Sequence, residues 1–159
     1  MKKTIAAGLI LTAVIAVAII IRFPFFTVRI GDEIVYLSPL FGGRQVVYQY
    51  THSVEKGPVR EYFRASREGF FLHKTSFTSQ GAGLPLNRGE FERENSLFVR
   101  TGIDDNYEML QFRLSSQFKE QIIEVSNDEL KMAKWGDPGE QIIVEVKTVA
   151  ELFKFFIRK

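Results

Sequence analysis

The sequence predicts a mainly β protein: an antiparallel β-sandwich or barrel-like domain with an N-terminal transmembrane helix and a short C-terminal helix. Three observations lead to this prediction. Short runs of alternating apolar and polar residues fill most of the chain, with turn signals roughly every 8–12 residues. Helical periodicity is almost absent from the interior of the chain. An apolar run lies at the N-terminus. Many short strands separated by turns are typical of antiparallel sandwiches and barrels.

Composition excludes several classes of function. The chain has 159 residues, enough for one domain and a short appendage. It has no cysteine, which excludes disulfides, thiolate nucleophiles and cysteine-based metal sites. Lys2 and Lys3 account for the net charge of +2, so the rest of the chain is neutral. A neutral domain lacks the basic field that nucleic-acid binding needs, and we expect no nucleic-acid partner.

An uninterrupted run of apolar, Gly and Thr residues occupies residues 5–21. Lys2 and Lys3 precede this run, and Arg22 closes it. A membrane-spanning helix needs roughly 17–25 predominantly apolar residues, so the run is long enough to span a bilayer. We therefore predict a signal-anchor transmembrane helix over residues 1–22.

A cleaved signal peptide is the alternative for this segment. Residues 16–18 read Ala-Val-Ala and resemble a cleavage site, but hydrophobic residues continue after them. This continuation favours an uncleaved anchor that contacts the membrane through residues 5–21, and the lysines favour a cytoplasmic N-terminus. We expect a single-pass protein of the cell membrane, with an extracytoplasmic β-rich domain at residues 23–159.

Nine segments beyond the anchor have the alternation of strands. They are residues 27–30, 33–37, 44–51, 59–66, 70–77, 96–101, 109–114, 121–125 and 141–147. Gly31 and Asp32 join the first two segments as a hairpin. We expect residues 90–95 to be charged and exposed, residues 102–106 to form a turn, and residues 129–135 to form a short strand or bend.

The C-terminal segment predicts a helix. Thr148 is placed to cap residues 149–158, with Glu151 at the third helical position. The helix has a broad apolar side. We expect it to close one end of the sheet structure rather than to lie on the membrane surface.

The most informative position is Glu61. In the strand at residues 59–66, alternation places Glu61 on the same face as Val59 and Phe63, and the opposite face is polar. The carboxylate of Glu61 therefore points to the apolar side. A buried carboxylate is costly unless it is paired, so this residue is a candidate for a structural or functional role.

A polar turn precedes this strand and carries His52, Ser53 and Glu55. Alternation from the strand at residues 44–51 would direct His52 to one face and Ser53 to the other. The Lys-Gly-Pro sequence at residues 56–58 breaks this alternation.

Three motifs together resemble a known family. They are Tyr50-Thr51-His52-Ser53-Val54-Glu55, Pro58-Val59-Arg60-Glu61-Tyr62 and Gly81-Ala82-Gly83-Leu84-Pro85. In combination they resemble domain-of-unknown-function family 1850, over roughly residues 44–141. The resemblance implies a small exported protein associated with TAXI-type TRAP transporters, with the transporter's membrane subunit or solute-binding protein as partner. It implies no mechanism.

Two chemical readings of the motif remain open. As a nucleophile set, Ser53 would attack, His52 would act as base and Glu61 would orient it. Adjacent strand residues diverge, however, and no Gly-x-Ser-x-Gly elbow is present. As a metal site, His52, Glu55, Glu61 and His73 would supply ligands, but the close spacing of a zinc motif is missing.

Two non-catalytic readings compete with these. In the structural reading, His52 and Glu61 form a hydrogen-bonded pair that fixes the two strands, and Ser53 caps the turn. In the recognition reading, the polar turn and the loop at residues 81–85 lie together, and the amides of Gly81 and Ala82, together with that of Gly83, hold a carboxylate.

We therefore expect a non-enzymatic, membrane-anchored accessory protein of a TAXI-type TRAP transporter, which acts by protein or ligand recognition. We expect neither a cofactor nor a metal. The alternatives are an exported enzyme or metal-binding domain that uses His52 and Glu61, and a small-ligand sensor.

Overall fold

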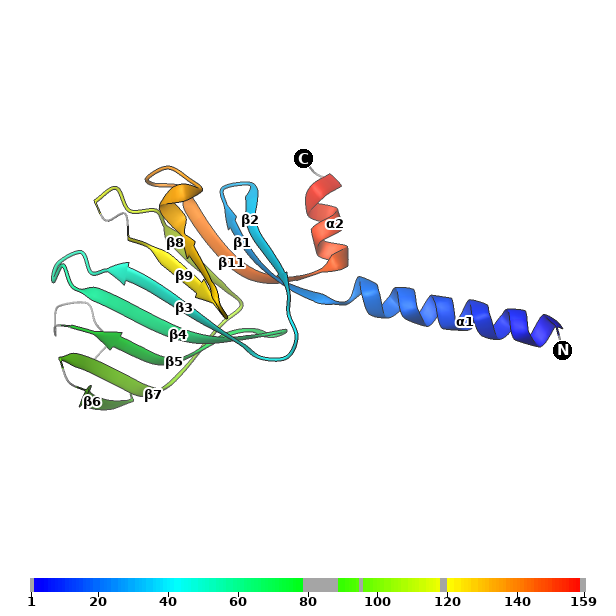
Figure 1. Cartoon of the computed structure of the whole chain (residues 1–159), viewed down its shortest axis with the longest axis horizontal. Helices are drawn as coiled ribbons and strands as arrows, with labels where there is room; N and C mark the ends of the chain where they lie inside the picture. The colour runs from blue at the N-terminus through cyan, green and yellow to red at the C-terminus, as the bar shows by residue number, and fades with distance from the viewer. Residues whose placement is uncertain (1, 79–88, 95, 118–119, 158–159) are drawn as a thin grey trace.

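The computed structural model describes residues 2–78, 89–94, 96–117 and 120–157 (Figure 1). The described helices are α1 (Lys2–Ile21), the short 3-10 helix η1 (Met132–Lys134) and α2 (Val149–Ile157). The described strands are β1 (Pro24–Ile30), β2 (Glu33–Pro39), β3 (Arg44–Thr51), β4 (Pro58–Ser66), β5 (Gly69–Phe77), β6 (Glu90–Glu94), β7 (Leu97–Tyr107), β8 (Met109–Arg113), β9 (Ile122–Val125), β10 (Asp128–Lys131) and β11 (Gln141–Thr148).

Two antiparallel sheets form the body of the protein. The smaller sheet has the strand order β2-β1-β11-β8, and the larger has the order β10-β9-β3-β4-β5-β7-β6. Neighbouring strands pair antiparallel throughout the described ladders. The predicted mainly β, antiparallel architecture with a short C-terminal helix is confirmed.

The two sheets share one apolar core. Phe26 and Val28 of β1 and Val144 of β11 are fully buried, as is Val46 of β3, and all four belong to a single packed cluster. Alternation explains the arrangement, because every second residue of these strands faces the opposite sheet. The side of each sheet that faces this core is called the inner face below, and the opposite side is the outer face.

The helix α1 projects away from the β domain (Figure 1). The predicted N-terminal helix is therefore confirmed. Within the part of the chain that the structure describes, no helix meets the length and apolarity expected of a membrane span. The assignment of α1 as a transmembrane helix stays a prediction.

The cap of α2 forms as the sequence indicates. The backbone amide of Thr148 donates to Oε2 of Glu151 at 2.7 Å, and the amide of Glu151 donates to the Thr148 hydroxyl at 3.3 Å. These reciprocal bonds satisfy amides that a helix N-terminus leaves without partners. Leu152 is the buried anchor of the helix.

The predicted turn at residues 102–106 is wrong. These residues belong to β7, which pairs with β5 on both sides of a register shift between Leu72 and Lys74. Gly102 adopts a left-handed conformation at φ 66°, and Ile103 is 2% exposed. A glycine permits the kink, and burial of the isoleucine holds the strand to the core beyond it.

The charged segment that follows residue 89 is exposed as predicted, but it is also a strand, β6. It pairs with β7 and forms an edge of the larger sheet. Charged side chains are common on edge strands because they discourage pairing with other chains. Exposed, charged residues in this segment therefore do not indicate a loop.

Candidate functional site

Glu61 lies on the inner face of β4, as alternation predicts. Its strand neighbours Val59 and Phe63 are 1% and 2% exposed. Across the ladder, Glu61 faces Tyr48 of β3 and Thr75 of β5. The register therefore surrounds this carboxylate with protein on both sides of its strand.

Burial changes the acid strength of Glu61. It raises the pKa of this carboxyl to about 7, and a hydrogen bond from Tyr50 opposes the shift only in part. That bond, from the Tyr50 hydroxyl to Oε1 of Glu61, is long at 3.5 Å. The pKa of Tyr50 is also raised, first by burial and then by the charge of Glu61. A carboxyl in this environment exchanges its proton near neutral pH.

Tyr48 anchors the neighbouring part of the inner face. Its ring stacks on Phe112 of β8 with 3.7 Å between ring centroids, and on Tyr50 at 5.1 Å. Its hydroxyl accepts a hydrogen bond of 2.7 Å from Nε2 of Gln121, a residue that is 5% exposed. Burial raises the pKa of Tyr48 to about 12.

Gln121 completes this arrangement. Its Nε2 also donates to the carbonyl oxygen of Arg113 at 2.9 Å, and its Oε1 accepts from the amide of Ser115 at 2.6 Å. The side-chain amide thus bonds to the segment at the end of β8 and to Tyr48. We call Tyr48, Tyr50, Glu61 and Gln121 the inner-face cluster.

The polar turn has its own local bonding. The amide of His52 donates to Gly57 at 2.9 Å, and its carbonyl accepts from Lys56 at 3.0 Å. The ring nitrogen Nδ1 of His52 accepts the Glu55 amide at 3.2 Å. Lys56 turns the chain with a φ of 57°. The His52 ring therefore serves the turn itself.

The structure does not bring His52 and Glu61 together. His52 lies beyond the paired residues, roughly 13 Å along β3 from Tyr48, which faces Glu61, at about 3.3 Å per residue. The predicted His52–Glu61 pair is therefore wrong: Glu61 bonds to Tyr50 and His52 to the Glu55 amide. Ser53 and Glu55 are exposed in the turn. The arrangement proposed for a Ser53–His52–Glu61 nucleophile set is not present.

His73 is also separate from these residues. It lies at the register shift of β5, where its ring stacks on Phe71 at 6.5 Å between centroids. Burial first, and then the positive charges of Arg64 and Lys74, lower its pKa. Among the residues that the structure describes, no group of three or more His, Asp or Glu side chains is placed to hold a metal ion.

The predicted glycine-rich contact lies outside the described residues. It comprises Gly81, Ala82, Gly83, Leu84 and Pro85.

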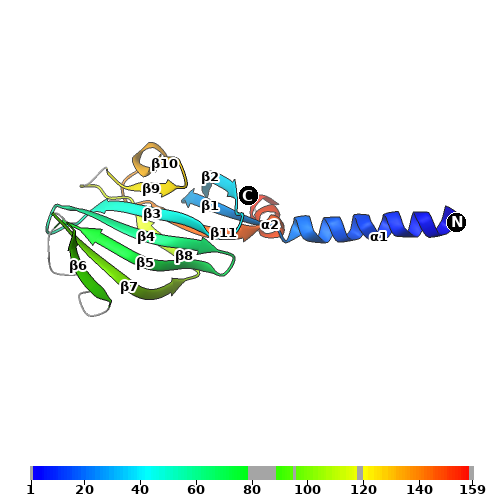
Figure 2. The same cartoon turned by 60° about the horizontal axis from the view of Figure 1, so that its bottom comes forward.

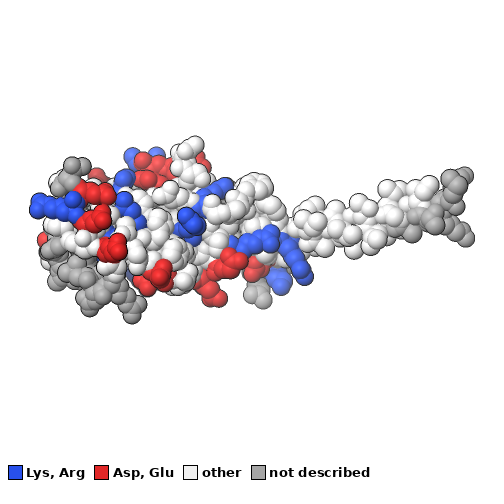
Figure 3. All heavy atoms as spheres, turned by 90° about the horizontal axis from the view of Figure 1, so that it is seen from below, with Lys and Arg blue, Asp and Glu red and all other residues white. Residues whose placement is uncertain are grey.

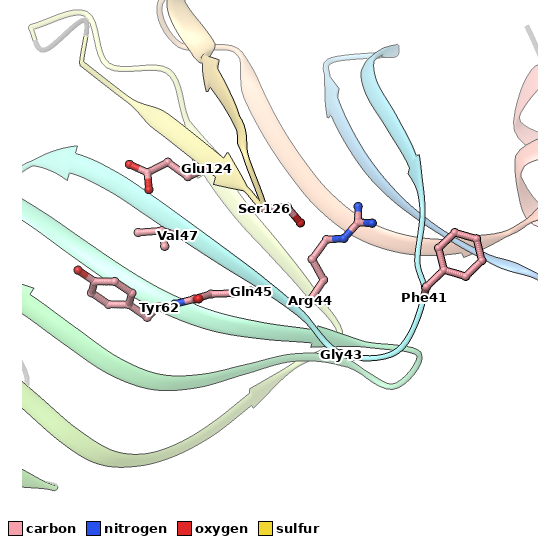
Figure 4. A pocket seen from close by; sticks show the side chains of 8 residues that line it. All are labelled: Phe41, Gly43, Arg44, Gln45, Val47, Tyr62, Glu124 and Ser126. Atoms are coloured by element: carbon pink, nitrogen blue, oxygen red, sulfur yellow. The ribbon is translucent and has the colours of Figure 1, made fainter.

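A hollow of about 490 Å³ lies on the outer face of the larger sheet (Figure 4). Val47, Tyr62 and Glu124 line it together with residues of the β2–β3 connection. Its charged groups already have partners: Glu124 pairs with Arg60 at 2.9 Å, and Arg44 donates to Ser38 at 2.7 Å. The charged groups of this hollow are therefore less available to a ligand than the carboxyl of the inner-face cluster.

The sequence held a signal for part of the inner-face cluster. Alternation placed Tyr48 and Tyr50 on one face of β3, and Glu61 on the apolar face of the paired strand, so that their contact followed from strand pairing. Gln121 had no such signal, because β9 is distant in sequence and its register with β3 comes from tertiary packing.

The fold and the site define a small antiparallel β domain with a partly buried carboxyl of raised pKa, that of Glu61, on its inner face. The family model described as "Domain of unknown function (DUF1850)" matches residues 46–132, more than half of the chain. The chain therefore belongs to this family. The match contains both the His52 turn and the inner-face cluster. No curated protein and no solved structure matches the chain.

Proposed function

We propose that the chain is a membrane-anchored, extracytoplasmic accessory protein of a TAXI-type TRAP transporter. The β domain acts by recognition of a protein or ligand and is held at the membrane by α1. The transporter's membrane subunit or its solute-binding protein is the partner.

The observation that carries this proposal is the exposure of α1. All of its described side chains, residue 5 and residues 8–21, are exposed, and the charge-free run at residues 5–21 gives the helix no polar face. Acidic and basic residues mix over the β domain, whereas the described part of α1 beyond its base carries neither (Figure 3). A helix that is apolar all round requires an apolar environment.

The connection between α1 and the β domain supports an anchoring role. The amide of Phe23 bonds to the carbonyl of Ile20 at 3.0 Å, and the Phe23 carbonyl accepts the Val149 amide at 3.2 Å. Arg22 and Phe23 alone separate the end of α1 at Ile21 from the start of β1 at Pro24. The helix is thus joined to a central part of the smaller sheet with little intervening linker.

Membership of the family supports the choice of partner. The match covers the His-Ser-Val-Glu and Arg-Glu-Tyr motifs, whose resemblance implies the TAXI-type transporters. The inner-face cluster and the turn offer recognition chemistry, whereas Glu61 faces Tyr48, four residues along the chain from His52, and bonds to Tyr50.

Transport activity tests the proposal. Deletion of the gene should reduce uptake by the TAXI-type transporter, and the full chain should restore it. A variant in which a cleavable signal peptide replaces α1, so that the β domain is released, should not restore uptake at equal protein level. Unchanged uptake after deletion, with transporter abundance unaltered, would refute the proposal.

Small-ligand sensing is a second candidate, and Glu61 favours it. A partly buried carboxyl with a pKa of about 7 and one long hydrogen bond retains capacity to accept a bond from an amine or hydroxyl group. Thermal shifts of the full chain with a panel of small amines and polyols would test this candidate, with Glu61→Gln as control. A shift that persists in Glu61→Gln would exclude Glu61 as the binding group.

A further inference from the structure

A second hollow, of about 330 Å³, lies between α1 and the turn that joins β4 to β5. Ile15, Ala18 and Ile19 of α1 line it, together with Arg22 and Arg67. The lining of this hollow therefore has an apolar part and a charged part. The apolar side chains come from the last turns of the helix, and the two guanidinium groups come from the helix end and from the β domain.

The two arginines have charge to offer. Both are exposed, and the other residues that line this hollow, Ile15, Ala18 and Ile19, carry no charge. The acid next to Arg67 is Glu68, whose Oε2 accepts a 2.7 Å hydrogen bond from the Ser66 hydroxyl. That bond is the first cause of the lowered pKa of Glu68, and Arg67 contributes last. Glu68 is thus engaged mainly within its own turn.

Apolar side chains surround the same end of the β domain. The helix α2 runs across the base of α1 rather than along it (Figures 1 and 2). It exposes Phe153, Phe156 and Ile157 by 67%, 57% and 67%. In the β2–β3 connection, Phe41 is 71% exposed and its ring packs edge-on against Phe23 at 5.2 Å. We call this region the membrane-proximal end.

These features match the chemistry of a bilayer interface. Aromatic side chains concentrate at the level of lipid headgroups, and a helix with exposed apolar residues can lie in the interface plane. The anchor α1 would bring the membrane-proximal end to that level. There an apolar helix surface meets acyl chains, and arginine binds phosphate through two parallel hydrogen bonds.

We propose that Arg22 and Arg67 bind the phosphate of an anionic membrane phospholipid, with its acyl chain against Ile15, Ala18 and Ile19. The proposal rests on the anchoring role of α1 proposed above. The bound lipid would fix the orientation of the β domain on the leaflet that it faces, with α2 and Phe41 in the interface.

Lipid retention tests this site. The full chain in mild detergent is mixed with equal amounts of phosphatidylglycerol and phosphatidylcholine, and retained lipids are counted by native mass spectrometry. Wild type should retain phosphatidylglycerol preferentially. Arg67→Gln should lower that retention about fivefold, the usual effect of one basic side chain at an anionic membrane surface. Arg64→Gln makes the same charge change on β4 outside the hollow and should retain lipid as wild type does.

Other outcomes would overturn the proposal. Equal retention of the two lipids by wild type would remove the site, and equal losses in both Gln variants would show a general charge effect. If Arg67→Gln weakened only the co-purification of a transporter subunit, the hollow would be a protein contact. Flotation with liposomes distinguishes the anchoring role of α1 from the lipid site. Failure of wild type to float contradicts the anchoring role, whereas flotation without lipid preference contradicts the lipid site alone.

The orientation can be measured independently. Because the chain has no cysteine, Phe156→Cys and Ser53→Cys each give one labelling site. A fluorophore at residue 156 should be quenched by brominated lipids in liposomes, whereas one at residue 53, in the turn at the other end of β3 and β4, should not. Equal quenching of the two labels would contradict the proposed orientation.

Discussion

His52 and Glu61 lie close in sequence on either side of one turn, yet they occupy two different regions. The ring of His52 accepts an amide within an exposed turn, whereas the carboxyl of Glu61 lies among the rings of the inner face. In a hairpin, two residues that are close in sequence need not contact each other, because they can lie at different distances from the turn. The partner of a strand residue is the one opposite in register, so Glu61 meets Tyr48 and Tyr50 rather than His52.

This comparison gives the two regions different energetic roles. The inner-face cluster combines stacked rings, a buried amide and a carboxyl of raised pKa. The turn contains backbone hydrogen bonds and one ring contact near solvent. Substitutions should therefore have large effects on the inner face and small effects in the turn.

The largest effect is expected for Tyr48→Ala. This change removes a ring stacked on Phe112 and leaves the Gln121 amide without its tyrosine acceptor. The free energy of unfolding should fall by roughly 4 kcal/mol, measured by urea unfolding of the full chain in detergent micelles. The same substitution at Tyr62, on the outer face, should cost much less. Equal losses would mean that the inner-face cluster does not stabilise the fold more than the outer face does.

A pH series sharpens the comparison through Glu61. Its folded-state pKa of about 7 lies above the usual 4.5, so folding favours the protonated form. The contribution of Glu61 to the free energy of unfolding should be fully present below pH ~4.5 and be lost, by roughly 3 kcal/mol, as pH rises through about 7. Glu61→Gln should remove this decrease. If the decrease survived in the variant, another group would be its cause.

The smallest effect is expected for His52→Ala. The substitution removes the acceptor for the Glu55 amide, which can bond to water instead. The loss should be under about 1 kcal/mol in the same urea series. A loss as large as that of Tyr48→Ala would show that the turn is coupled to the core, and the contrast between the two regions would fail.

Much of the fold followed from local pattern. Alternation located most of the strands, and Thr148 with Glu151 located the start of α2. The error at residues 102–106 arose because Gly102 is a turn signal in isolation, whereas burial of Ile103 continues the strand. Tertiary packing overrode local propensity there.

The candidate site was predictable only in part. Alternation gave the inward direction of Glu61 because that direction depends on its own strand. Its partner depends on register, and the proposed pairing with His52 was guided by adjacency along the chain. Gln121 reaches Tyr48 from the position just before β9, and the spacing along the sequence contains no information about that contact.

Association with the transporter tests the central claim most directly. The full chain, tagged at its C-terminus, would be isolated from membranes under mild detergent and its partners identified by mass spectrometry. The account predicts recovery of the TAXI-type membrane subunit or solute-binding protein, with Tyr62→Ala as a folded control. A correctly folded, membrane-bound chain that recovers neither subunit would contradict the account.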